Sequence, residues 1–149
     1  MKEKQIGEIR AFNRFYTDVI GLLDRYILNS SYTLPEVRVL FEIYYQQPIT
    51  ASDIIASLHI DKGYLSRMIL QFEKRKLLSR KRLATDGRSA QLFLTAAGKK
   101  EFEVLDRASH EQIKEILASL SEEDGDRLVQ YMAGIRSILS PDKKQSAKP

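Results

Sequence analysis

The 149-residue sequence contains no cysteine, no tryptophan and only two histidines. Without cysteine the chain can form no disulfide framework, no thiolate nucleophile and no thiol redox sensor. Because a zinc site usually needs about three or four ligands, two histidines in different segments do not predict a metal centre. No apolar run approaches the roughly 18 residues of a membrane span, and the charged start of the chain is unlike a signal peptide. These absences favour a cytoplasmic protein without a membrane segment.

Catalytic motifs are missing as well. The sequence contains no nucleophile–base pair, no paired acids in a known motif and no glycine-rich loop of the kind that cradles phosphates. We therefore expect neither an enzyme nor a bound cofactor. With 43% apolar and 30% charged residues, the composition is that of a globular chain, and the length favours a single domain.

Positive charge, by contrast, is concentrated in one block. The whole chain carries a net charge of +4, but residues 59–100 contain eleven lysines and arginines against three acidic residues. The rest of the chain is net negative. A chain that needed charge only for solubility would spread it, so a block of one sign suggests a polyanionic partner. A solvated basic face without a partner is the alternative at this point.

The spacing of apolar residues predicts two helices in the first part of the chain. Over residues 3–28 they recur at steps of three and four, which indicates a long amphipathic helix. Thr33 is a candidate N-cap, and Pro35 suits the first turn of a second helix, which residues 46–48 interrupt. The predicted buried stripe of this second helix consists of Val37, Leu40, Phe41 and Tyr44.

The middle of the chain predicts a helix-turn-helix followed by a hairpin. Thr50 and Asp53 match a capping box, which would begin a short helix. The next helix covers residues 62–76, and two short helices with so tight a connection make a helix-turn-helix. Alternating stretches at 78–84 and 90–95 predict two strands. The expected fold is therefore mainly α with a small β-hairpin wing, a winged helix-turn-helix.

Two further amphipathic helices and a polar, disordered tail complete the predicted organisation. The predicted parts are a winged helix at about 34–95, flanking helices at about 3–28 and 96–139, a single domain over 1–140 and a tail at 141–149.

One face of the helix at 62–76 carries residues suited to contact with DNA. Its apolar residues fall in one inward sector: Leu65, Met68, Ile69 and Phe72. Residues near the N-terminus of a recognition helix read base edges in the major groove. The candidate DNA contacts here are Lys62, Gly63, Tyr64, Ser66 and Arg67. A surface arginine without function is the alternative for Arg67.

The predicted hairpin places further cations beside this helix. Arg80, Lys81 and Arg82 lie on its first strand, where side chains alternate between the two faces. These cations would suit phosphate contacts, and Arg88, near the tip, would suit a narrow minor groove. Asp86 stands two residues from Arg88 in the expected turn at 85–88, so a structural pairing is the alternative role of Arg88.

Six short motifs follow one another in order along the chain. They are Thr50-x-x-Asp-Ile, Leu65-Ser66-Arg67, Phe72-Glu73-x-x-x-Leu77, Arg80, Asp86-Gly-Arg88 and Leu94-Thr95-x-x-Gly98. Together they resemble the MarR (multiple antibiotic resistance regulator) family of bacterial transcription regulators, and the resemblance extends to about Leu139. It implies a homodimer, built from the terminal helices, that binds palindromic operators on double-stranded DNA, mostly as a repressor.

The resemblance also implies further roles for individual residues. Asp86 would brace the wing by pairing with an arginine. A small, often aromatic effector would bind between dimer stem and DNA-binding arm, with Phe12, Tyr16 and Tyr44 as candidate pocket residues. The family usually has glycine where this chain has Lys76, which predicts a different end to the preceding helix.

Two other interpretations stay open on sequence alone. Winged helices also serve as protein–protein interaction modules. In addition, the N-terminal run at 9–16 is similar to that of regulators fused to an acetyltransferase domain, so the chain could be the regulatory fragment of such a fusion.

Overall fold

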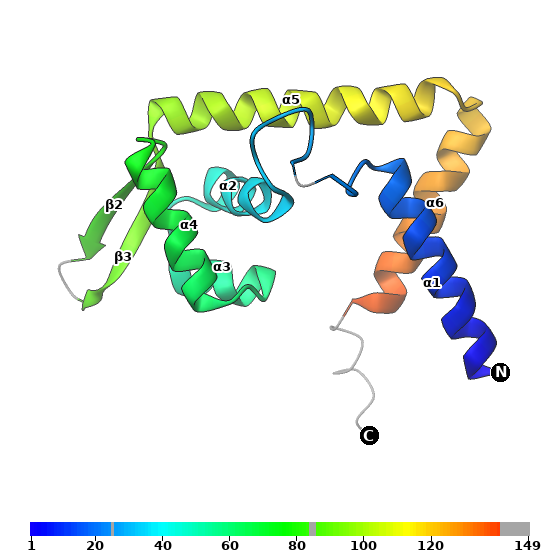
Figure 1. Cartoon of the computed structure of the whole chain (residues 1–149), viewed down its shortest axis with the longest axis horizontal. Helices are drawn as coiled ribbons and strands as arrows, with labels where there is room; N and C mark the ends of the chain where they lie inside the picture. The colour runs from blue at the N-terminus through cyan, green and yellow to red at the C-terminus, as the bar shows by residue number, and fades with distance from the viewer. Residues whose placement is uncertain (25, 84–85, 141–149) are drawn as a thin grey trace. The chain divides into compact units, whose positions relative to one another are not determined.

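The computed structural model describes residues 1–24, 26–83 and 86–140, without the side chains of residues 83 and 86–88. Within these residues the chain forms helices and strands in the following order (Figure 1): α1 (Lys2–Val19), α2 (Leu34–Gln46), β1 (Ile49–Thr50), α3 (Ala51–Leu58), α4 (Lys62–Lys74), β2 (Leu78–Leu83), β3 (Asp86–Leu94), α5 (Ala96–Ala118) and α6 (Glu122–Leu139). The chain divides into two compact units, Met1–Ser109 and the part from His110 onward, so α5 runs through the boundary. Every helix in the described part of the chain is too short or too polar to cross a bilayer.

The three strands form one antiparallel sheet in which β3 lies between β1 and β2. Ile49 pairs with Leu92 on one side of β3, and Leu78 pairs with Leu94 on the other. The predicted hairpin is therefore present, and β1 adds a short third strand. However, β3 begins at Asp86 rather than at residue 90, so the backbone of residues 86–88 is strand and not turn.

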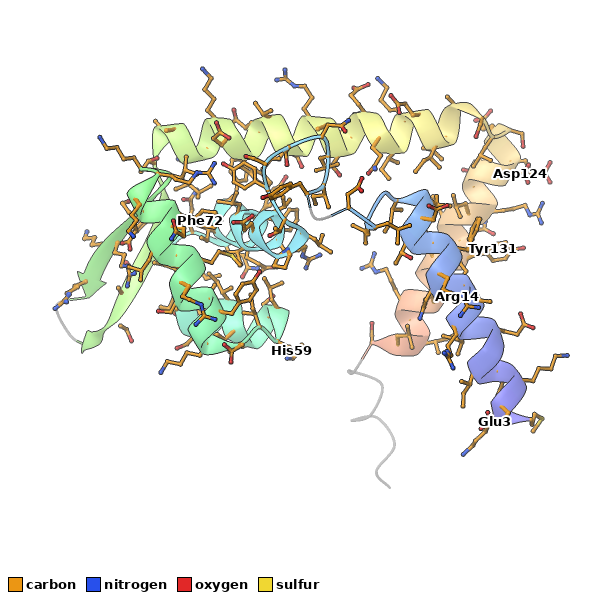
Figure 2. All side chains as sticks on the ribbon, viewed as in Figure 1. Glu3, Arg14, His59, Phe72, Asp124 and Tyr131 are labelled. Carbon is orange, nitrogen blue, oxygen red and sulfur yellow. The ribbon has the colours of Figure 1, made fainter. Side chains whose placement is uncertain are left out.

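The core lies between α2, α3, α4 and the sheet, and one face of α5 closes it. The inward sector predicted for α4 is confirmed, because Leu65, Met68, Ile69 and Phe72 are all buried. Phe72, labelled on α4 in Figure 2, is fully buried, and Phe102 of α5 is buried in the same cluster. These contacts make residues 32–105 the winged helix-turn-helix.

The first helix is shorter than the sequence predicts. It ends at Val19, and Gly21 follows in the left-handed region with φ of 67°. Glycine adopts this conformation without steric cost, so it favours a turn at this point over continued helix. The segment that leads to α2 still contributes to the core, because Ile27 and Tyr32 are buried.

The predicted buried stripe of α2 is also partly wrong. Leu40 is buried as expected, but Phe41 remains 42% exposed. Val39 and Ile43 are fully buried in its place, which rotates the buried face by about one residue. The rotation arises because the sequence of α2 is apolar on more than one side, and tertiary contacts decide which side is covered.

Side-chain caps fix where the helices of the winged helix begin. The backbone N–H of Thr33 donates to Glu36 Oε2 at 2.7 Å at the start of α2. At α3 the capping box is present: Thr50 N donates to Asp53 Oδ2 at 2.9 Å, and Asp53 N donates to Thr50 Oγ1 at 3.2 Å. Hydrogen bonds from Thr50 lower the pKa of the Asp53 carboxyl below its ordinary value.

Lys76 occupies the corner between α4 and β2 in a left-handed conformation, with φ of 58°. The N–H of Leu77 donates to the carbonyl of Phe72 at 2.9 Å, which closes the end of α4 as in a Schellman motif. A residue with a side chain normally avoids this conformation, and glycine accepts it. The different helix end that the sequence predicted is therefore wrong: the lysine keeps the same helix end that glycine would give, at a cost in backbone strain.

We expect Lys76→Gly to stabilise the protein by about 1 kcal/mol, because it removes the left-handed strain at this corner. Urea denaturation at a fixed protein concentration measures the difference. Lys76→Ala is the matched control, since it removes the same charge and keeps the Cβ; its stability should stay close to that of the parent. Equal stabilisation by both substitutions would attribute the effect to charge instead.

Candidate nucleic-acid interface

The exposed side of α4 presents the residues that the sequence singled out. Lys62, Gly63, Ser66 and Arg67 are exposed, and Tyr64 is 39% exposed. Leu70 is 49% exposed and lies on the same side, one turn beyond Arg67. The buried sector described above faces the core, so this exposed ridge is the surface that α4 offers to a partner.

Asp61 fixes the N-terminal end of this ridge. Its side chain caps α4 by accepting the backbone N–H of Tyr64 at 2.8 Å. A Cβ at Gly63 would lie 3.3 Å from the carboxylate oxygen of Asp61 and 3.5 Å from Nη1 of Arg67. Because glycine has no Cβ, it leaves room for the carboxylate of Asp61 and for the guanidinium of Arg67. This accounts for a glycine near the start of α4.

Arg80 connects the wing to α4. Its Nε and Nη2 donate to the two carboxylate oxygens of Glu73 at 2.7 and 2.8 Å, a bidentate ion pair between β2 and α4. The contact of Arg80 with DNA that the sequence predicts stays a prediction. The structure adds a bracing role that holds the hairpin against α4.

Lys81 and Arg82 follow on β2, and both side chains are exposed. Lys81 pairs with Gln91 and Arg82 with Ala90, so the two cations point to opposite faces of the hairpin. The side chains of Asp86 and Arg88 lie outside the described residues. Their predicted pairing, and the predicted contact of Arg88 with a minor groove, therefore stay predictions.

A polar network centred on the buried Tyr32 joins the C-terminal end of α4 to α5. Arg75 Nη2 donates to the hydroxyl of Tyr32 at 2.7 Å, and this hydroxyl donates to Glu101 Oε2 at 3.1 Å. The guanidinium also lies over the Tyr32 ring, 4.5 Å from its centroid. Burial is the main cause that raises the pKa of the Tyr32 phenol to about 12. No local sequence pattern marks this network, because its three members lie far apart in the chain.

The three residues predicted for an effector pocket fall into two aromatic groups. Phe12 and Tyr16 stack on each other within α1, with centroids 5.6 Å apart. Tyr44 packs against Phe102 of α5 at 4.4 Å, and Phe41 and Tyr45 surround that pair. Among the described residues, no three histidine or acidic side chains are placed to hold a metal ion.

A helix-turn-helix whose second helix presents an exposed, basic ridge beside a braced hairpin defines the winged helix-turn-helix class. The profile of the MarR family matches residues 32–90, which are the helix-turn-helix and most of the wing. Over these residues the chain is similar to the MarR family.

Comparison with individual proteins gives the same fold. The chain is 28% identical over 104 residues to YdgJ, an uncharacterised HTH-type transcriptional regulator of Bacillus subtilis strain 168; the match covers 70% of this chain and 63% of YdgJ. Among solved structures, FabT of Streptococcus pneumoniae in complex with DNA has a TM-score of 0.74 at 18% identity, covering 92% of this chain and 96% of FabT. BpsR of Bordetella bronchiseptica, whose DNA binding is regulated by 6-hydroxynicotinic acid, has a TM-score of 0.67 at 20% identity, covering 88% and 98%.

Proposed function

We propose that the chain is a sequence-specific DNA-binding transcription regulator that acts in the cytoplasm as a homodimer. The observation that carries the proposal is the exposed ridge of α4, where Lys62, Ser66 and Arg67 stand on the side of the helix turned away from the core. A helix of this kind fits the major groove, where side chains near its N-terminus reach base edges. The proposal includes no catalytic activity and no cofactor.

The wing supplies the contacts that do not depend on sequence. Lys81 and Arg82 are exposed on β2 beside α4, and phosphate contacts of this type position a protein on the duplex. The Glu73–Arg80 ion pair supports this role, because it fixes the hairpin relative to the helix that reads bases. We assign Arg88, near the tip, to the adjacent minor groove.

Exposed apolar faces on the terminal helices support a homodimer. No residue of α1 or α6 is buried. Both carry large exposed apolar side chains: Ile6, Ile9, Phe12 and Phe15 on α1, and Val129, Tyr131, Ile135 and Ile138 on α6. So many large apolar side chains exposed on two helices indicate an interaction site, and most soluble homo-oligomers are two-fold dimers.

We expect a dimer in sedimentation equilibrium at micromolar concentration, because pairing two chains would cover these faces. Ile135→Glu, which places a charge on the exposed apolar side of α6, should shift the equilibrium toward monomer. Glu123→Gln in the polar first turn of α6 is the control and should leave it unchanged. A parent protein that sediments as a monomer would rule out the dimer.

DNA binding itself is tested by selection from a random library followed by footprinting. Two arms related by a two-fold axis would place the recognition helices about 34–36 Å apart, so the selected site should be an inverted repeat. The affinity should fall steeply with salt. A protein without salt-dependent affinity for any duplex would instead be a protein-binding winged helix.

We further propose that the regulator is a repressor that responds to a small effector. Support comes from BpsR, which resembles this chain in fold and whose DNA binding responds to 6-hydroxynicotinic acid. The aromatic group formed by Phe41, Tyr44, Tyr45 and Phe102 at the α2–α5 contact offers flat apolar surface to such a ligand.

A further inference from the structure

One apolar side chain, that of Leu70, stands among the polar residues of the exposed ridge of α4. It is 49% exposed. Its neighbours on the helix surface, three and four positions away, include Ser66 and Arg67 on one side and Glu73 and Lys74 on the other. A single exposed leucine is common on protein surfaces. The position of Leu70 on this ridge, and not its exposure alone, therefore needs a physical reason.

Leu70 is the last member of a stripe that runs along the outward side of α4. The stripe consists of Gly63, Ser66, Arg67 and Leu70, which follow one another at steps of three, one and three residues. These steps place all four residues in one sector of an α-helix, opposite the buried sector. Homeodomain recognition helices contact bases with residues at this same spacing. Leu70 is therefore positioned to meet base edges together with Arg67.

The charges around Leu70 suit DNA better than an apolar protein surface. Arg67 and Lys74 lie before and after it on the ridge, and both are exposed. Glu73, the only acidic residue of α4, is held by Arg80 in the bidentate ion pair. A polyanion would be attracted on both sides of the leucine, whereas an apolar protein partner would have to desolvate two cations.

We propose that Leu70 is a specificity-determining residue that contacts the C5 methyl group of a thymine in the major groove. The inference rests on the proposed function. Thymine is the base that presents a methyl group in this groove, and apolar side chains contact it there. Three residues of an α-helix span about 4.5 Å, and successive base pairs are about 3.4 Å apart. The thymine therefore lies about one or two base pairs from the position that Arg67 contacts.

The test replaces each thymine in one half-site of the selected operator, one at a time, by deoxyuridine. This change removes the C5 methyl group and keeps the hydrogen-bonding atoms of the base. At one thymine we expect the parent to lose about four-fold in affinity, which corresponds to one buried methyl group. Leu70→Ala should bind the thymine and uracil duplexes equally, because the alanine side chain is too short to reach the methyl group.

Gln71→Ala is the matched control for Leu70→Ala. Gln71 is the next residue of α4, it is exposed, and it lies outside the stripe. Its truncation should keep the four-fold loss at the same thymine. Fluorescence anisotropy at one salt concentration measures the affinity of all three proteins for the operator, for each uracil duplex and for an unrelated duplex.

Several results would overturn the inference. If Leu70→Ala kept the four-fold loss, a different side chain would contact that methyl group. If Leu70→Ala weakened binding to the operator and to the unrelated duplex by the same factor, Leu70 would support the helix or the backbone contacts and would read no base. A sensitive thymine more than about three base pairs from the position that Arg67 contacts would contradict the predicted register.

Binding of the unmodified operator separates failure of this inference from failure of the proposed function. If the parent has no salt-dependent affinity for any duplex, the proposed function fails, and Leu70 has no base to contact. If the parent binds the operator with the expected salt dependence but tolerates uracil at every position, the proposed function stands. In that case only the role of Leu70 is wrong.

Discussion

Gly98→Ala should destabilise the protein by about 3 kcal/mol. A Cβ at position 98 would lie 1.9 Å from the carbonyl oxygen of Leu77, a distance that no relaxed structure tolerates. The neighbouring atoms cannot yield easily, because the Leu77 carbonyl accepts the N–H of Thr95 at 3.0 Å and the hydroxyl of Thr95 donates to Lys76 at 2.7 Å. The alanine would therefore push α5 away from the α4–β2 corner.

Urea denaturation at a fixed protein concentration measures this effect. The control is Ala97→Ser, which adds one heavy atom to the adjacent, exposed position of α5 and should cost about 0.5 kcal/mol or less. A loss below about 1 kcal/mol for Gly98→Ala would mean that α5 can shift without cost. The close approach of the helix to the corner would then have no structural importance.

Arg67→Ala should lower the affinity for the selected operator by about 1–3 kcal/mol of binding free energy and relax the preference for one position of each half-site. Arg67 stands on the exposed ridge of α4, where a lost base contact affects the correct sequence more than others. Lys81→Ala should instead weaken binding to all duplexes alike and reduce the salt slope by about one per lost contact.

Competition binding against the operator, single-base variants of it and an unrelated duplex, at three salt concentrations, distinguishes the two effects. Each variant is the control for the other, because both remove one exposed cation, Arg67 from α4 and Lys81 from β2. If both variants lost the same affinity on every duplex, α4 would bind the backbone and the assignment of Arg67 as a reader of bases would be wrong.

Local patterns in the sequence predicted the parts of the fold that depend on one segment alone. The capping box at Thr50 and Asp53 and the inward sector of α4 depend on spacings of three or four residues, which the sequence displays directly. The early end of α1 coincides with Gly21 in the left-handed region. Glycine also tolerates helical backbone, so its presence in the sequence does not by itself predict a turn. The face that α2 buries depends on α5, a contact across about sixty residues.

In the candidate site, too, the sequence predicts the features that depend on one segment and misses those that depend on contacts between segments. Exposure of Lys62, Ser66 and Arg67 followed from the helical period. The pairing of Arg80 with Glu73, seven residues apart, depends on the position of β2 against α4, which no local sequence pattern displays.

The phenol of Tyr32 links the C-terminal end of α4 to α5. Arg75, at the end of the helix proposed to read DNA, and Glu101, on α5, lie 43 and 69 residues away along the chain and share this single hydroxyl. A rotation of α5 about its own axis would carry Glu101 with it and apply a torque to α4 through the phenol, or else would break a charge-assisted hydrogen bond. The Tyr32 hydroxyl therefore ties the end of α4 to α5, and a displacement of either helix would change the hydrogen bond that the other makes.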